Sequence, residues 1–315
     1  MTLTMFSSKK PWTVAEERIK QFINLYQPKW LYVMFSGGRD SAAVLAAARS
    51  VTSDIVAVYL HIAGQTHRDN VVAAIEAAKR LDIDVVNLGV ARRGSLRHKV
   101  MKAVEEHGTP VMLHIITVDY QRHVDYWTAL KIYGFPAPRE RWGGGKRWCC
   151  AHFKSDWMAE LPPNASVNGR PVRALLVGIR REESNYRKKL WSDVGKLPLR
   201  IFKARDGLDD YALAPILDMT TAEVDEMLRH YGIADIILRQ YERWRRAPNC
   251  MLCPLMGKAE CRLALQNMPT TYLQRVKQVL EELLPRYKDG TFSKNKIREW
   301  IEMIDEELAR RADNT

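Results

Sequence analysis

The sequence predicts an α/β protein with a parallel sheet covered by helices and a more helical C-terminal part. Three observations indicate this class. Short apolar runs alternate with amphipathic segments through the first half of the chain, which is typical of repeated strand–helix units. A small-residue turn over 36–41 joins an apolar run to an alanine-rich segment. The second half shows mainly helical spacing of its apolar residues.

The elements of the first half follow in order. A capping box of Thr13 and Glu16 predicts the start of the first helix, because apolar residues then recur at helical spacing. The apolar run 30–35 predicts the first strand. Further strands are predicted at 55–60, 85–88, 111–116 and 172–178, with helices at 69–81 and around 96–106. Ligands of such sheets bind beyond the carboxyl ends of the strands, where the turn lies.

The second half reads as a succession of helices. Another capping box, Thr220 and Glu223, predicts a helix that ends near Gly232, and 233–246 continues as the next one. From Cys261 onward the pattern is helical, with a final amphipathic helix over 293–312. We therefore expect an α/β domain over 1–218 and a helical region over 219–315.

Composition narrows the class of protein. The chain has 315 residues, 46% of them hydrophobic, enough for a large core. It lacks an uninterrupted apolar run of membrane-spanning length and a signal-peptide pattern, so we expect a cytoplasmic protein without a membrane partner.

A net charge of +12 and a pI near 9.5 favour a polyanionic partner such as nucleic acid. Two basic stretches with interleaved aromatic residues, 139–148 and 239–246, are candidate contacts; a solvated basic face is the alternative.

The turn Ser36-Gly37-Gly38-Arg39-Asp40-Ser41 predicts a phosphate-binding site. Its glycines let the backbone approach a ligand closely, its serines add hydroxyl groups, and the following helix would present its N-terminus. No lysine is present in it, so it is not a Walker loop. The ligand expected from these residues is a nucleotide; the alternative is an ordinary turn between a strand and a helix.

The five cysteines form a second constellation. Cys149 and Cys150 are adjacent, Cys250 and Cys253 have Cys-x-x-Cys spacing, and Cys261 follows. Two thiolates at that spacing can bind one metal from a tight turn, and two remote anchors can complete a four-thiolate site. Such sites hold zinc or an iron–sulfur cluster. A redox dithiol and inert buried cysteines are the alternatives.

Ser-Gly-Gly-x-Asp-Ser after a strand resembles the PP-loop signature of the ATP pyrophosphatases. The segment 176–187, with its Gly-x-Arg-x-x-Glu-Ser pattern, and the segment 211–220, where Met219 replaces a usual tryptophan, resemble the phosphoadenylylsulfate (PAPS) reductase-like branch. The resemblance implies an adenine nucleotide alpha hydrolase-like core that binds ATP and Mg²⁺. It implies Asp40, Arg180 and Arg181 as catalytic residues, and as nucleotide-binding residues Ser36, Gly37, Gly38, Arg39, Asp40, Ser41, His61, Gly178, Arg180 and Glu183.

The cysteine layout resembles the ATP pyrophosphatase subunit of DNA phosphorothioation systems. That resemblance implies a [4Fe–4S] cluster on Cys149, Cys250, Cys253 and Cys261, with Cys150 as a spare or as a replacement for one of them. It implies adenylation of a nucleic acid, DNA rather than tRNA, followed by sulfur insertion. A cysteine desulfurase would supply the sulfur, with partner subunits.

Two other functions stay open from the sequence. One is a [4Fe–4S] adenylylsulfate or PAPS reductase that releases sulfite. Adenylylsulfate reductases also use Cys-Cys plus Cys-x-x-Cys, although this chain has no cysteine after Cys261 to serve as their C-terminal nucleophile. The other is a nucleotide-gated nucleic-acid-binding module with a structural cluster.

Overall fold

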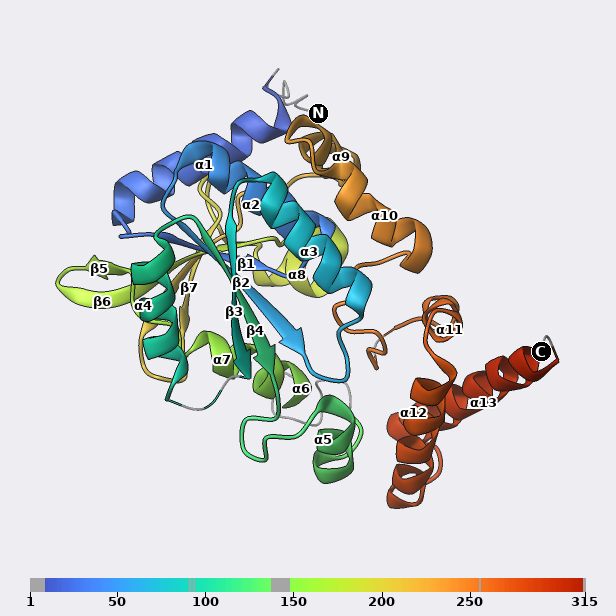
Figure 1. Cartoon of the computed structure of the whole chain (residues 1–315). Helices are drawn as coiled ribbons and strands as arrows, with labels where there is room; N and C mark the ends of the chain where they lie inside the picture. Colours follow the sequence, from blue (N-terminus) through green and yellow to red (C-terminus); the bar gives the residue numbers. More distant parts are fainter. Residues whose placement is uncertain (1–8, 91, 93, 137–147, 255, 314–315) are drawn as a thin grey trace.

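The computed structural model describes residues 9–90, 92, 94–136, 148–254 and 256–313. Its described part contains one sheet in the order β3-β4-β2-β1-β6-β8-β7, with β5 paired to β6 (Figure 1). Six strands, in the spatial order β3-β4-β2-β1-β6-β8, run parallel to one another. β7 pairs antiparallel with β8, and β5 pairs antiparallel with β6. The predicted α/β class is confirmed. The strands are β1 Leu31–Phe35, β2 Ile55–Ile62, β3 Asp84–Val90, β4 Val111–Thr117, β5 Ala165–Val167, β6 Arg170–Val177, β7 Leu199–Lys203 and β8 Asp209–Leu213.

Helices flank the sheet and make up the C-terminal part. In chain order they are α1 Pro11–Tyr26, α2 Arg39–Val51, α3 Arg68–Arg80, α4 Leu96–His107, α5 Tyr126–Tyr133, α6 Trp148–Cys150, α7 Asp156–Met158, α8 Asn185–Leu190, α9 Thr221–His230, α10 Ala234–Trp244, α11 Lys258–Gln266, α12 Thr270–Leu283 and α13 Phe292–Ala312. A π-helical turn, η2 Ala151–Ser155, joins α6 to α7, and two 3₁₀ turns are η3 Arg181–Glu183 and η4 Leu284–Arg286.

The two predicted capping boxes have different outcomes. Thr220 caps α9, and its side chain and that of Glu223 bond reciprocally as predicted. The first helix begins instead at Pro11, two residues before Thr13. Proline at the first helical position has its φ already set and loses no hydrogen bond there, so the helix extends past the predicted cap.

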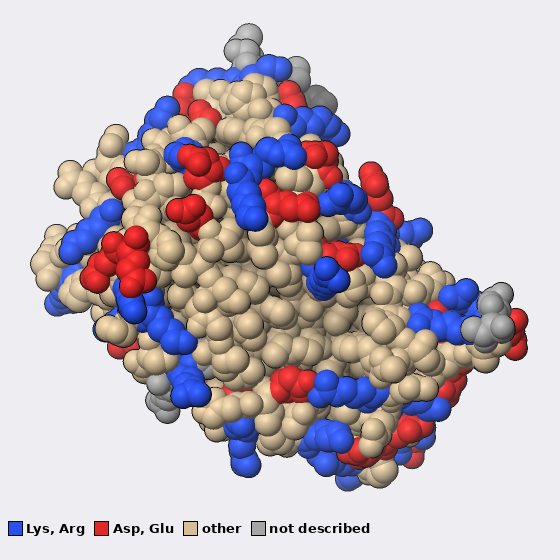
Figure 2. All heavy atoms as spheres, in the orientation of Figure 1, with Lys and Arg blue, Asp and Glu red and all other residues tan. Residues whose placement is uncertain are grey.

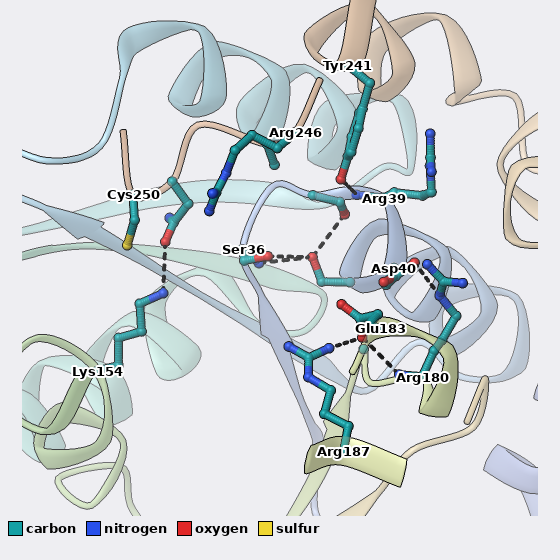
Figure 3. Close-up of a pocket in the computed structure, with 15 residues that line it drawn as sticks. Ser36, Arg39, Asp40, Lys154, Arg180, Glu183, Arg187, Tyr241, Arg246 and Cys250 are labelled. Carbon is teal, nitrogen blue, oxygen red and sulfur yellow. Dashed lines mark hydrogen bonds and ion pairs between the residues drawn. The ribbon is translucent and has the colours of Figure 1, made fainter. Parts of the chain in front are cut away.

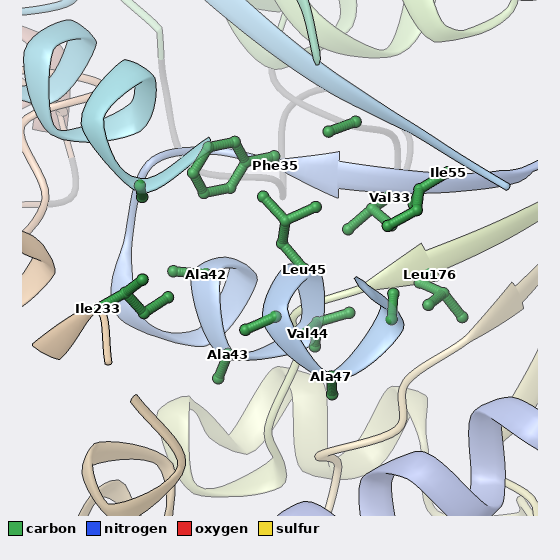
Figure 4. Close-up of a cluster of buried hydrophobic side chains, with 14 of the residues drawn as sticks. Val33, Phe35, Ala42, Ala43, Val44, Leu45, Ala47, Ile55, Leu176 and Ile233 are labelled. Carbon is green, nitrogen blue, oxygen red and sulfur yellow. The ribbon is translucent and has the colours of Figure 1, made fainter. Parts of the chain in front are cut away.

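The sheet is buried on both faces, as its apolar strands require. Alternate residues of β1 enter opposite cores: Leu31 and Val33 pack with α2, whereas Tyr32 packs with α4 and α7. Figure 4 shows the first of these cores, where the alanine-rich α2 lies against β1 and β2. The small side chains of α2 let the helix approach the sheet closely. This packing fixes the turn at the carboxyl end of β1.

A second region of the chain has its own core. Helices α11, α12 and α13 pack with α5 around buried apolar residues that include Trp127 and Trp300. Helices α9 and α10 follow the predicted boundary at residue 218, yet their apolar residues pack in the same core as α2. None of the helices in the described ranges combines the length and apolarity needed to cross a bilayer.

Candidate active site

The turn between β1 and α2 is held in a fixed shape. Gly37 has a φ of +72°, which favours glycine, and a Cβ there would lie 2.7 Å from the Asn70 side chain. The Ser41 hydroxyl lies 3.0 Å from the Gly38 carbonyl, to which it donates, and accepts from the Ser36 N–H at 3.1 Å. Because Gly38 caps α2 without a side chain, the helix presents backbone N–H groups at its start. Such a start favours an anion.

A cavity of about 390 Å³ lies at this turn (Figure 3). Five cationic side chains and two carboxylates line it, so its charge favours an anionic ligand. Eight of the residues predicted to bind nucleotide line it: Ser36, Gly38, Arg39, Asp40, Ser41, Gly178, Arg180 and Glu183. The cavity is also lined by Lys154, Arg187 and Asn249, which come from distant segments and were not among the predicted site residues.

Asp40 and Arg180 form the central ion pair of the cavity. The Arg180 Nε atom lies 2.9 Å from Asp40 Oδ1, and both side chains are largely buried. Burial raises the pKa of Asp40, and the Arg180 guanidinium opposes that shift. Glu183 accepts from the Arg180 backbone N–H at 3.0 Å and pairs with Arg187. Arg180 therefore holds Asp40 in place and also lines the cavity to which the sequence assigned it as a nucleotide-binding residue.

Three residues predicted to be catalytic or to bind nucleotide do not line the cavity: Gly37 of the turn itself, Arg181 and His61. Arg181 pairs with Asp218 and donates to the Trp191 carbonyl at 2.8 Å. The backbone at Arg180 is extended, so neighbouring side chains point in different directions and only the first reaches the cavity. The ring of His61 stacks on that of His114, with Nδ1 and Nε2 3.3 Å apart.

Four cysteines meet in a small pocket next to this cavity. Cys149, Cys150, Cys250 and Cys253 line it together with apolar and aromatic side chains. The first two stand where α6 passes into the π-helical turn η2, an irregularity that is frequent at functional sites. Gln65, which the sequence analysis missed, holds the Cys-x-x-Cys turn: its amide donates to the Leu252 carbonyl at 2.8 Å and accepts from the Leu252 N–H at 3.2 Å.

Cys261 does not line this pocket. It lies in α11, fully buried, and Lys296 and Glu299 of α13 are among the charged groups that act on it. Burial raises the pKa of its thiol to about 12. The structure therefore brings Cys150, rather than Cys261, to the other three predicted ligands. Within the described ranges, no group of three or more His, Cys, Asp or Glu side chains is arranged to hold a single metal ion.

The cavity and the cysteine pocket share two residues, Lys154 and Cys250. Figure 3 shows both side chains beside the cavity, with Lys154 Nζ 3.2 Å from Asn249 Oδ1. The neighbouring thiol groups, Cys250 foremost, raise the pKa of Lys154 despite its burial. Burial raises the pKa of Cys250, and Lys154 acts against that shift. A thiol and an ammonium group thus lie between the two sites.

The structure describes one of the two basic stretches, 239–246, in full and only the last residue of the other. Trp244 is buried and donates to Asp69, whereas Tyr241 lines the cavity and its hydroxyl accepts from the Arg39 N–H. Of the other stretch, 139–147 lies outside the described residues, and Trp148 is buried. On the face seen in Figure 2, basic and acidic side chains are interspersed around an area without charged residues. This face has no continuous basic surface.

No protein-family model and no curated protein sequence matches this chain. Among solved structures it is similar to the NH3-dependent NAD synthetase from Campylobacter jejuni subsp. jejuni NCTC 11168, with 11% identity, 97% of this chain and 96% of that chain covered, and a TM-score of 0.38. It is also similar to the NMN synthetase from Francisella tularensis, with 11% identity, 96% and 97% covered, and a TM-score of 0.42. The ligand of the site is therefore inferred from the residues of the site and not from these similarities.

Proposed function

We propose that this chain is an adenylating enzyme that binds ATP in the cavity at the PP-loop and splits the bond between the α and β phosphates. The N-terminus of α2, the serine hydroxyls and the excess of cationic side chains support a polyphosphate ligand. An acceptor oxygen would attack the α-phosphorus, and pyrophosphate would leave with the electrons of the broken P–O bond. Arg187, Arg246 and Lys154 are placed to stabilise the negative charge that develops.

Asp40 and Glu183 are the carboxylates of the cavity, and oxygen ligands of this kind suit the Mg²⁺ that accompanies ATP. When bound, Mg²⁺ would neutralise phosphate charge. Asp40 Oδ1 already accepts from Arg180, so the guanidinium would hold the carboxylate in a fixed orientation toward such an ion.

The more specific part of the proposal is that the enzyme transfers sulfur. The observation that carries it is that Lys154 and Cys250 line both the cavity and the cysteine pocket. Sulfur chemistry at the cysteine pocket would then take place next to the adenylated acceptor. Four thiols in an otherwise largely apolar pocket are a donor set that suits a [4Fe–4S] cluster on Cys149, Cys150, Cys250 and Cys253. When bound, the cluster would supply sulfur or electron chemistry.

We propose a nucleic acid, DNA before tRNA, as the acceptor, in line with the net charge of +12. A phosphate oxygen of the backbone would be adenylated, and sulfur at the oxidation level of sulfide would then displace AMP. A cysteine desulfurase is the proposed sulfur donor. It delivers sulfur as a persulfide, so a thiol reductant would supply the two electrons that bring this sulfur to the level of sulfide, the thiol itself being oxidised to a disulfide. Further subunits are proposed as partners, in the cytoplasm.

The reductase is the second candidate, because the cysteines that meet in the pocket are the Cys-Cys and Cys-x-x-Cys pairs. That reaction needs a thiol to attack the sulfur of the nucleotide. Cys261 is buried and does not line the cavity, and Cys250 would be a cluster ligand. The adenylating reaction needs no such thiol, so we place it first.

An activity assay on protein purified without oxygen tests this choice. We expect ATP to yield AMP and pyrophosphate in the presence of DNA and sulfide, and adenylylsulfate to yield no sulfite. Thiol-dependent release of sulfite with ATP left intact would instead establish the reductase. Binding of ATP without release of pyrophosphate would establish a nucleotide-gated binding module.

The ligand set gives a separate prediction. Cys150→Ser should lose most of the iron and acid-labile sulfide of the purified protein, because the structure places this thiol in the pocket. Cys261→Ser, the matched control, should keep both, because Cys261 lies in the helical core. Metal and sulfide analysis with visible absorption checks this. Iron retained in the first variant and lost in the second would restore the set predicted from the sequence, and zinc without sulfide would replace the cluster.

A further inference from the structure

A chain of buried polar side chains joins the nucleotide turn to the cysteine pocket. The Gln240 amide donates to the Gly37 carbonyl at 3.0 Å, and the Asn70 amide donates to Gln240 Oε1 at 3.0 Å. The Asn249 amide lies 3.5 Å from Asn70 Oδ1, and Asn249 Oδ1 accepts from Lys154 at 3.2 Å. Every link runs from a donor to an acceptor, so the path is continuous from the turn to Lys154.

The three amides of this chain are out of solvent. Asn70 is 0% exposed, Gln240 4% and Asn249 8%. A buried amide without partners is costly, so each is held in the one orientation that satisfies both of its ends. Turning the Gln240 amide over would place its oxygen against the Gly37 carbonyl and its nitrogen against the Asn70 amide, which breaks two bonds together. The hydrogen bonds along this path therefore form or break together.

The ends of this path are the two places where ligands are proposed to bind. Gly37 lies in the turn at the start of α2, and a side chain there would collide with Asn70. At the other end Asn249 precedes Cys250, and Lys154 lines both the cavity and the cysteine pocket. A shift of the turn when it closes on phosphate would thus be passed to the segment that carries the Cys-x-x-Cys pair.

We infer that Asn70 and Gln240 are positioning residues that make the nucleotide turn and the Cys-x-x-Cys turn one mechanical unit, so that a nucleotide bound at the first orders the second. The inference rests on the proposed binding of nucleotide in the cavity. By linkage the effect is reciprocal: whatever orders the cysteine turn strengthens nucleotide binding by the same factor. The adenylation would thereby be coupled to the state of the thiol site.

Backbone hydrogen exchange, measured on the protein as purified, tests this. The probe is α,β-methylene-ATP, which cannot be cleaved between the α and β phosphates. The readout is the exchange of the N–H groups of Met251, Leu252 and Cys253, which lie outside the lining of the cavity. Protection of the turn 36–41 reports binding itself. We expect the analogue to slow exchange at 251–253 by about tenfold, within the usual range of coupling between sites.

Gln240→Met keeps the length of the side chain but removes both of its hydrogen bonds in the path. In this variant the analogue should still protect the turn and should no longer slow exchange at 251–253. Tyr59→Phe is the matched control, because it removes a buried hydrogen bond to Asn70 that is a side branch of the path. It should keep the tenfold effect. If Gln240→Met does not fold, Gln240→Asn, whose shorter amide cannot reach Gly37, takes its place.

The outcomes separate this inference from the proposed function. Protection of the turn with no response at 251–253 in the unaltered protein overturns the coupling and leaves nucleotide binding standing. An undiminished response in the Gln240 variant overturns the role of the amides. Absence of any protection of the turn overturns the coupling together with the proposed function.

Discussion

Replacing Gly178 with alanine is expected to weaken ATP binding about 100-fold, the effect of losing one hydrogen bond to a charged phosphate, which is worth about 1.5–3 kcal/mol. Gly178 follows β6 and touches the first turn of α2. A Cβ there would lie 2.6 Å from the Ser41 backbone nitrogen and 2.8 Å from the Asp40 carbonyl carbon. These are backbone atoms that cannot rotate away, so the start of α2 must move away from β6.

The measurement is ATP binding by titration calorimetry, with urea unfolding measured alongside. The same collision should lower the free energy of unfolding by about 1–3 kcal/mol, the usual cost of overpacking. Gly195→Ala is the matched control, because a Cβ at Gly195 meets no atom within 4 Å. Unchanged ATP affinity in Gly178→Ala would show that the start of α2 does not form the binding site.

Replacing Arg173 with methionine is expected to lower the free energy of unfolding by about 3–5 kcal/mol, the cost of removing one partner of a buried ion pair. The side chain of Arg173 in β6 is 1% exposed. Its guanidinium lies 2.6 Å from Asp210 and 2.8 Å from Asp206, and it also donates to the Leu161 carbonyl at 3.1 Å. Methionine would fill part of the space but remove this guanidinium from both carboxylates, of which Asp206 keeps its longer ion pair with Arg97 at 3.7 Å.

Urea unfolding at neutral pH checks this second prediction. Arg170→Met is the control on the same strand, because Arg170 is exposed and its replacement should change the free energy by no more than about 0.5 kcal/mol. A loss below about 1 kcal/mol in Arg173→Met would mean that the two carboxylates find water or other partners. In that case Arg173 would not be what ties β8 and its hairpin to the centre of the sheet.

Much of the fold could be predicted because its signals are local. Apolar runs predicted β1, β2, β4 and β6, and the Thr220 capping box predicted the start of α9. Strands β7 and β8 escaped prediction because they lie toward the edge of the sheet and are partly exposed. β8 also begins with two aspartates, Asp209 and Asp210, so it lacks an apolar run.

Within the candidate site, the sequence by itself determined the turn over 36–41, because glycines and serines between a strand and a helix have a local physical meaning. Only the tertiary structure decided which cysteines meet. Spacing along the chain does not decide whether Cys150 or Cys261 joins the other three cysteines. The packing of α11 against α13 places Cys261 in the hydrophobic core of the C-terminal helices. Arg181 was misplaced because a shift of one residue along an extended backbone reverses the side chain. Gln65, Asn70 and Gln240 carry no signal in sequence, since a buried amide acquires its role only from the groups that folding brings around it.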